Sequence, residues 1–136
     1  MSIQTNQEAH LKDFVRLNEI WITEHFSLEE ADRELAQNPG KVISNGGYVF
    51  SLTSGDQVVG VCALFKESDT RYQLARMAVA PEHRGKGHGN KLIEHALAKA
   101  KELGAANVFL LSNTVLHSAI ELYKKFGFGT VSTGQH

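Results

Sequence analysis

Apolar residues recur along this chain with two different spacings, one helical and one strand-like, and these spacings divide it into predicted elements. In the N-terminal part, Leu11, Phe14 and Trp21 fall on one helical face. This spacing predicts a helix over residues 8–25, and an apolar–polar alternation just before it predicts a short strand at residues 3–5.

A second helix is predicted to follow the first after a short break. Ser27 and Glu30 have the S-x-x-E spacing of a capping box, which marks a helix N-terminus. The sequence Asn38-Pro39-Gly40 is expected to end this helix. The side chains expected to face inward are Leu28, Ala31 and Leu35. Residues 42–47 are predicted to form a loop or a short extended piece.

Strand-like runs dominate the middle of the chain. They cover residues 48–52, 58–65 and 72–79, and polar turns join them. The run at 58–65 is almost entirely apolar, as expected for a central strand covered on both faces. Gly60 within it predicts a bulge or a close approach of the backbone to another element.

Helical and strand-like segments alternate in the C-terminal half. A helix is predicted over residues 87–103, ending at Gly104, and a strand over residues 107–111. The apolar face of the helix over residues 87–103 is predicted to consist of Leu92, Ile93, Ala96, Leu97, Ala100 and Leu103. A last helix is expected to begin at Asn113 or Thr114 and close at Gly127, before a final strand at residues 128–131.

The order of these elements predicts an α+β (mixed α/β) fold. Hairpins come first, and a strand–helix–strand crossover follows, so the strands at 72–79 and 107–111 should be parallel. The expected architecture is therefore a mixed sheet flanked by helices on both faces.

Composition narrows the class of protein further. The chain has 136 residues, 42% of them hydrophobic, which predicts one domain over residues 1–136. A net charge of −1 argues against bulk binding to nucleic acid or to an anionic membrane. The apolar runs are too short to span a bilayer, and no signal peptide is visible. Cys62 is the single cysteine and is predicted to be a small buried hydrophobe. Because one cysteine cannot form an intrachain disulfide, the reducing cytoplasm is the expected compartment.

The glycine-rich sequence Arg84-Gly85-Lys86-Gly87-His88-Gly89 is the strongest candidate for chemistry. It lies where a strand passes into a helix N-terminus, whose free N–H groups and dipole attract anions. Arg84, Lys86 and His88 would add positive charge. The spacing fails both the Walker A pattern and the dinucleotide fingerprint, which disfavours a nucleotide-binding domain. The scattered histidines do not form a metal-ligand set.

Two sequence stretches together resemble the GCN5-related N-acetyltransferases (GNAT family). The first is L-x-x-M-A-V-x-P-x-x-R-G-x-G-x-G, at residues 74–89, and the second is A-I-E-L-Y-K-K-F-G-F, at residues 119–128. The resemblance implies acetyl-CoA as cofactor and a βαβ cofactor-binding core. It further implies that the strand end at Met77–Val79 pairs with the pantetheine arm and that the N–H groups of residues 84–89 hold the pyrophosphate. The implied cofactor contacts are Met77, Ala78, Val79, Arg84, Gly85, Lys86, Gly87, His88, Gly89 and Asn113.

The resemblance also implies a catalytic residue. Tyr123 matches the tyrosine that often protonates the leaving coenzyme A thiolate, a task that suits a neutral phenol. Many members have an asparagine at the position of Leu116, and here Asn113 is expected to replace it. The chain also ends without the last C-terminal strand expected of the family, so either the sequence is a truncated piece or a second copy completes the sheet in a homodimer.

The expected reaction is acetyl transfer to a primary amine of a small molecule or peptide, by direct attack on the thioester. Gln73 stands where a carboxylate base would be useful, and it cannot take a proton. The candidate bases are Glu24, Glu67 and Glu82, and each of them reads more readily as a surface charge. Trp21, His25, Phe26, Tyr48 and Phe50 read equally well as acceptor-pocket residues and as core aromatics. The alternative function is a non-catalytic acyl-CoA-binding or regulatory module.

Overall fold

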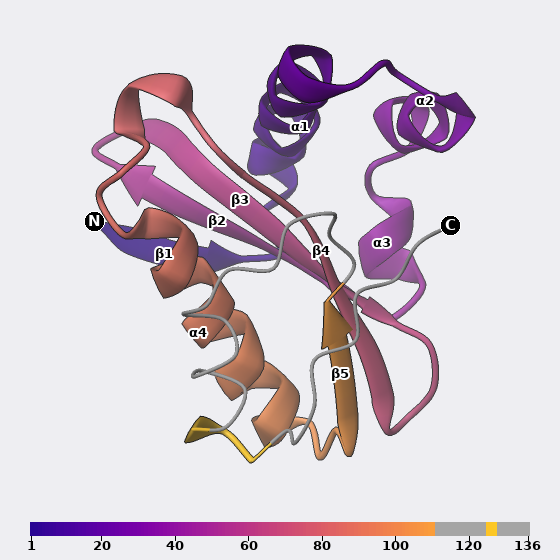
Figure 1. Ribbon diagram of the computed structural model, residues 1–136. Coiled ribbons are helices and arrows are strands. Elements are labelled where there is room, and N and C mark those ends of the chain that lie inside the picture. Colours follow the sequence, from indigo (N-terminus) through magenta and orange to yellow (C-terminus); the bar gives the residue numbers. More distant parts are fainter. Residues whose placement is uncertain (111–124, 128–136) are drawn as a thin grey trace.

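The described part of the chain forms a five-stranded mixed sheet with helices on both faces, in agreement with the predicted mixed sheet (Figure 1). The structure is a computed structural model that describes residues 1–110 and 125–127. The strands lie in the order β1-β2-β3-β4-β5. Their bounds are Ser2–Thr5, Tyr48–Ser54, Gln57–Lys66, Arg71–Val79 and Asn107–Leu110.

The sheet combines antiparallel hairpins with one parallel crossover. Strands β1 to β4 pair antiparallel with their neighbours. Helix α4, His88–Glu102, connects β4 to β5, and these two strands pair in parallel from Arg71↔Asn107 to Leu74↔Leu110. This β4–α4–β5 unit is the predicted βαβ core.

Two apolar cores lie on opposite faces of the sheet. On one face, Leu92, Ile93 and Leu97 of α4 pack against the sheet, each with at most 1% of its surface exposed. On the other, Phe14 and Leu17 of helix α1, Leu11–His25, pack against Val61 and other residues of the central strands. Figure 1 shows α1 and α4 on opposite sides of the sheet. Successive side chains of β3 point alternately into the two cores, which explains why residues 58–65 are apolar.

Gly60 plays both of the roles that the sequence predicts for it. The pairing of β2 with β3 shifts register beside it, because Leu52 pairs with Gly60 but Thr53 pairs with Val58. A Cβ atom at Gly60 would also lie 3.0 Å from Cδ1 of Leu92. The missing side chain thus lets α4 lie close to the central strand.

The N-terminal helices differ from the prediction in their ends. A short 3-10 turn, Glu8–His10, precedes α1. Helix α2 is Glu30–Gln37, so the predicted capping box at Ser27 is wrong. Asp32 accepts a hydrogen bond of 2.8 Å from the N–H of Glu29, and this interaction sets the start of the helix two residues later.

The inward face of α2 and the segment after it also differ from expectation. Leu35 is half-buried and packs on the α1-side core, but Ala31 is exposed. The predicted loop over residues 42–47 begins with a helical turn instead, α3, Lys41–Ser44. The N–H of Ser44 donates to the carbonyl of Gly40, and Val42 is buried against the sheet. The burial of Val42 stabilises this turn, since short helical turns depend on tertiary packing.

The remaining C-terminal predictions lie almost wholly outside the described residues. These are the last helix, the final strand, Asn113, Leu116 and Tyr123. Of that region, the structure describes Lys125–Gly127, where Phe126 packs against the α4-side core and accepts a hydrogen bond of 3.0 Å from Lys101. Gly127 has the positive φ, +83°, that suits the end of a helix. Within the described part of the chain, no helix is long and apolar enough to cross a membrane.

Candidate functional site

A break in strand β4 is the first unusual feature of the site. Arg76 has a left-handed backbone with φ of +59°, which is rare for a residue that is not glycine. The pairing with β3 shifts register there, since Val61 pairs with Ala78 but Ala63 pairs with Ala75. Such a bulge redirects the strand, and observed strain of this kind concentrates at functional sites.

Two neighbouring helices hold Arg76 in this conformation. Asn18 of α1, only 5% exposed, donates hydrogen bonds to the carbonyl oxygens of Phe14 (2.9 Å) and Arg76 (3.1 Å). Asp32 of α2 forms an ion pair with the guanidinium group of Arg76. Burial acts to raise the pKa of Asp32, but the hydrogen bonds from Arg76 and from the Glu29 backbone, with the charges of Arg76 and Arg33, lower it overall.

The edge of β4 that follows the bulge has a described strand on one side only. Its Ala78 and Val79 pair with β3, and the described pairing with β5 ends at Leu74↔Leu110. Within the described ranges, the backbone of Met77–Val79 therefore has no strand on its β5 side. This is the edge on which the sequence predicts the pantetheine arm, and an extended chain can pair with it as an added strand.

The glycine-rich loop comes next, and its backbone turns toward the start of α4. A 3-10 turn, Pro81–His83, follows β4, and Gly85 and Gly87 have φ of +78° and +80°. Gly87 is the N-cap of α4. Within the described part of the chain, no atom beyond the immediate chain neighbours lies within 4 Å of where a Cβ of either glycine would be, so the described residues leave this backbone surface uncovered.

The amides of this loop are available to an anion. Among the residues that the structure describes, the N–H groups of residues 85–89 have no backbone partner, and those of His88 and Gly89 belong to the first turn of α4. The helix dipole adds partial positive charge at this point, and the side chain of Lys86 lies on the same loop. The loop thus fits a phosphate or pyrophosphate group.

The side chain of Arg84 does not add its charge to this surface as expected. Its Nε donates to the carbonyl of Val79 at 3.0 Å, and its two terminal nitrogens bind both carboxylate oxygens of Glu24 at 3.1 and 2.9 Å. Arg84 therefore links the end of α1 to the start of the loop. Glu24, a candidate base in the sequence, is the partner of this guanidinium group.

His88 also departs from expectation, because it is not a surface cation. It is 6% exposed, and neither ring nitrogen has a hydrogen-bond partner among the described residues. The ring of His83 lies beside it, with centroids 6.2 Å apart, and its Nδ1 is likewise buried and unpartnered. Burial, followed by the charges of Lys91, His83 and Lys86, lowers the pKa of His88.

The other candidate residues are distributed over the molecule. Phe50 is fully buried in the α4-side core, and the partly buried Tyr48 stacks on it. Trp21 contacts Phe26 at the end of α1, with ring centroids 5.7 Å apart. Glu67 pairs with Arg71 at 3.5 Å in the turn between β3 and β4.

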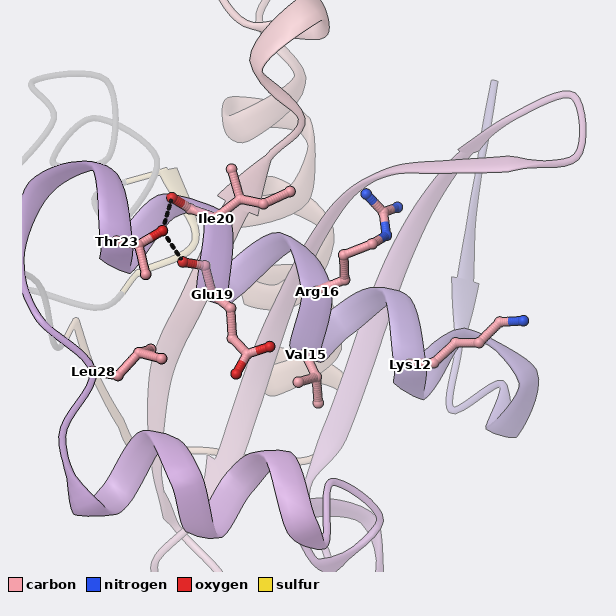
Figure 2. Close-up of a pocket in the computed structure, with 7 residues that line it drawn as sticks. All are labelled: Lys12, Val15, Arg16, Glu19, Ile20, Thr23 and Leu28. Atoms are coloured by element: carbon pink, nitrogen blue, oxygen red, sulfur yellow. Dashed lines mark hydrogen bonds between the residues drawn. The ribbon is translucent and has the colours of Figure 1, made fainter.

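A shallow hollow of about 440 Å³ lies on the surface of α1 that faces away from the sheet (Figure 2). It is lined by Lys12, Val15, Arg16, Glu19, Ile20, Thr23 and Leu28. None of these residues belongs to β4 or to residues 84–89, so the hollow is distinct from the site described above.

Asn18 and Asp32 were missed by the sequence analysis, although each left a signal. Asn18 is a polar residue on the otherwise apolar face of α1, next to Leu17. Arg76, their common partner, is a charged residue inside an apolar strand. Polar residues at positions that the pattern predicts to be buried indicate a specific tertiary partner.

Comparison with known proteins agrees with the fold and the motif. The Acetyltransferase (GNAT) family model matches residues 9–128. The chain belongs to this family. Among its curated relatives, N-acetyltransferase family 8 member 2 from Rattus norvegicus is 33% identical over 100 residues, covering 70% of this chain and 44% of the relative. Streptothricin acetyltransferase from Streptomyces lavendulae is 33% identical over 93 residues, covering 60% of this chain and 49% of the relative.

Solved structures share the fold at low sequence identity. A GNAT family acetyltransferase from Brucella melitensis, in complex with acetyl-CoA, has a TM-score of 0.73 and 20% identity, covering 95% of this chain and 82% of that one. A predicted acetyltransferase from Clostridium acetobutylicum, with acetyl-CoA, has a TM-score of 0.71 and 15% identity, covering 99% and 94%. The chain spans about half the length of the curated relatives it matches.

Proposed function

We propose that this protein is an acetyl-CoA-dependent N-acetyltransferase that modifies a primary amine of a small molecule or peptide. The observation that carries the proposal is the run of amides at residues 85–89 that have no backbone partner among the described residues, directly after the edge of β4 that has no described strand beside it. One surface thereby offers an anion site and an extended backbone edge, which match the pyrophosphate and the pantetheine arm of one cofactor.

The binding roles follow from this arrangement. The N–H groups of residues 85–89 hold the pyrophosphate, and Lys86 adds a charge to it. The backbone of Met77, Ala78 and Val79 pairs with the pantetheine arm. Arg84 positions the loop through Glu24 and the Val79 carbonyl, and Asn113 is assigned a coenzyme contact from the family motif.

The chemistry requires an activated acetyl donor, which acetyl-CoA supplies as a thioester when bound. A backbone N–H near Val79 donates to the carbonyl oxygen as negative charge develops. Tyr123 delivers a proton to the departing thiolate. Gln73 cannot accept the amine proton, so a water relay is assigned that task. A single buried cysteine suits a reducing cytoplasm, and a homodimer is the proposed assembly.

Thermal unfolding with acetyl-CoA tests the cofactor. At a concentration about 100 times Kd, a ligand stabilises the folded state by about 2.7 kcal/mol, which raises the Tm of a domain of this size by several degrees. Gly87→Asp should abolish the shift, because it places a carboxylate where the pyrophosphate binds.

Gly55→Asp is the matched control for this variant. Gly55 also has a positive φ, +60°, with no other atom within 4 Å of a Cβ, but it lies in the turn between β2 and β3. The Gly55→Asp variant introduces similar backbone strain and the same charge, so acetyl-CoA should still raise its Tm. A wild-type protein with no shift at millimolar acetyl-CoA would contradict the proposal.

A non-catalytic acyl-CoA-binding module is the second candidate. It is favoured by the ion pairing of Glu24 and Glu67 with arginines, which leaves two of the three candidate bases engaged. Thiol release from acetyl-CoA with a panel of amines separates the two functions. Turnover that Tyr123→Phe slows without changing acetyl-CoA binding supports the enzyme, and binding without turnover supports the module.

A further inference from the structure

Among the residues that the structure describes, three buried ring nitrogens at the glycine-rich loop have no hydrogen-bond partner. They are Nδ1 and Nε2 of His88 and Nδ1 of His83. His88 is the first residue of α4, and only 6% of its surface is exposed. Buried polar atoms normally have hydrogen-bond partners, so an unsatisfied pair of rings at a helix N-terminus needs an explanation.

The charges that face His88 are mostly positive. His83 comes from the 3-10 turn, Lys86 from the loop and Lys91 from α4 itself. All three lower the pKa of His88. Helix α1 contributes Glu24 to this region, but its carboxylate is bound by both terminal nitrogens of Arg84. In the free protein, a proton on His88 would therefore lie buried among like charges, and the neutral ring is favoured.

We propose that His88 takes up a proton when the coenzyme A pyrophosphate binds to residues 85–89, so that the bound state contains an imidazolium at the start of α4. The inference rests on the proposed function, because the same loop holds the anion. It assigns His88 a binding role as a charged group, beyond the backbone contact that the family motif implies.

The physical reason is a change of sign in the local field. The pyrophosphate of the cofactor carries two negative charges, which oppose those of Lys86 and Lys91 and favour the cationic ring. An imidazolium has two N–H donors, which serve an anion oxygen or a water bound to it. The ring of His83 lies beside that of His88, with centroids 6.2 Å apart, and its Nδ1 also has no partner among the described residues.

The direction of the pH dependence follows from this coupling. The pKa of His88 is lowered in the free protein and rises in the complex, so cofactor affinity is weakest above both values. Affinity increases as pH falls through the bound-state value and levels off below the free-state value. If the pKa of His88 differs by about one unit between the free and the bound protein, the Kd for the cofactor changes by about tenfold across this pH range.

Isothermal titration calorimetry with dephospho-coenzyme A measures the proton directly. This probe keeps the pyrophosphate but lacks the 3′-phosphate, whose own titration near neutral pH would confuse the result. Titrations at pH 7 in two buffers with different ionisation enthalpies give the number of protons taken up. We expect uptake of up to about one proton and an affinity about 3- to 10-fold weaker at pH 8 than at pH 6.

Variants of His88 and, as a control, of His95 on the same helix show whether the proton binds to His88. His88→Gln and His88→Leu should remove both the uptake and its share of the pH dependence, and the apolar variant suits the buried site. His95→Gln is the control, since His95 lies on the same helix but packs against Phe50, with ring centroids 5.2 Å apart. It should retain the uptake of the wild type.

The outcomes separate this inference from the proposed function. If the wild type binds neither dephospho-coenzyme A nor acetyl-CoA at any pH, the proposed function is wrong. If it binds without proton uptake, or if the uptake persists in both His88 variants, the function stands and the role of His88 is overturned.

Discussion

Arg76 shows how single residues organise the described part of the site. A left-handed residue inside a strand is maintained only where its surroundings over-determine it. Here Asn18 binds the carbonyl and Asp32 binds the guanidinium group of the same residue. Asp32 also receives the N–H of Glu29, so one carboxylate both caps α2 and ties it to β4. The site is thus built from polar contacts between three elements.

Asp32→Asn should lower the free energy of unfolding by about 1 kcal/mol at pH 7, as expected for a helix cap that also accepts a charged hydrogen bond. The pKa of Asp32 is lowered in the folded state, so its contribution is present above the ordinary value of about 4 and is lost as pH falls through the folded value. Denaturant unfolding at several pH values checks this. The difference from wild type should vanish at strongly acidic pH.

Asp69→Asn is the control for that experiment. Asp69 pairs with Lys66 at 3.2 Å, but its side chain is 95% exposed. Such surface pairs contribute little to stability. A loss as large as that of Asp32→Asn would show that removal of any paired carboxylate has the same effect, and would contradict the role given to Asp32.

At the scale of elements, the contact of α4 with β3 sets the position of the helix N-terminus. Gly60 and Leu92 meet where the strand has its register shift. Leu92 lies one turn after His88, so any displacement of the helix at Gly60 moves the amides of the loop as well. The close approach at Gly60 therefore serves the site as well as the core.

Gly60→Val should destabilise the protein by about 1–3 kcal/mol, because its side chain overlaps that of Leu92. Leu92→Ala alone should cost about 2–5 kcal/mol through the cavity it leaves. Together the two changes should cost less than their sum, because the valine occupies part of that cavity. Denaturant unfolding of the single and double variants measures this coupling.

Leu97→Ala supplies the comparison for the double variant. Leu97 is also fully buried on the same helix face, but it is not among the nearest contacts of a Cβ at Gly60. Its effect should add to that of Gly60→Val. Simple additivity for Leu92→Ala as well would contradict the proposed contact.

At the scale of the whole molecule, Cys62 reports on the integrity of the α4-side core. Its thiol is fully buried, and Sγ lies 3.9 Å from the carbonyl of Leu92. Burial raises the pKa of the thiol well above its ordinary range, so the reactive thiolate is suppressed in the folded state.

A thiol reagent such as a disulfide of nitrobenzoate should therefore leave the folded protein unmodified at pH 8 and react fully in denaturant. The reaction rate should follow opening of the core, and acetyl-CoA should slow it by stabilising the folded state. Absorbance of the released thiolate measures the reaction. Rapid labelling of the native protein would show that the sheet and α4 separate locally.

The periodicity of the chain was sufficient for most elements and for the class of fold. The strands, the βαβ crossover and the buried face of α4 were all predicted, because alternation of apolar residues is a local property that burial enforces. The helical turn at Lys41–Ser44 and the start of α2 were predicted wrongly. The turn depends on a partner distant in sequence, the sheet under Val42, whereas the start of α2 depends on the contact of Asp32 with the N–H of Glu29, which competes locally with the S-x-x-E pattern.

The same division applies to the candidate site. By itself, the sequence determined the glycine-rich loop, its place between β4 and α4, and the family, because glycine and proline impose backbone conformations locally. Only the tertiary structure decided that Arg84 turns to Glu24, that His88 is buried and that Arg76 is held by two helices. Side-chain direction depends on which charged and polar groups the fold brings within hydrogen-bonding distance, and those groups are far apart along the chain.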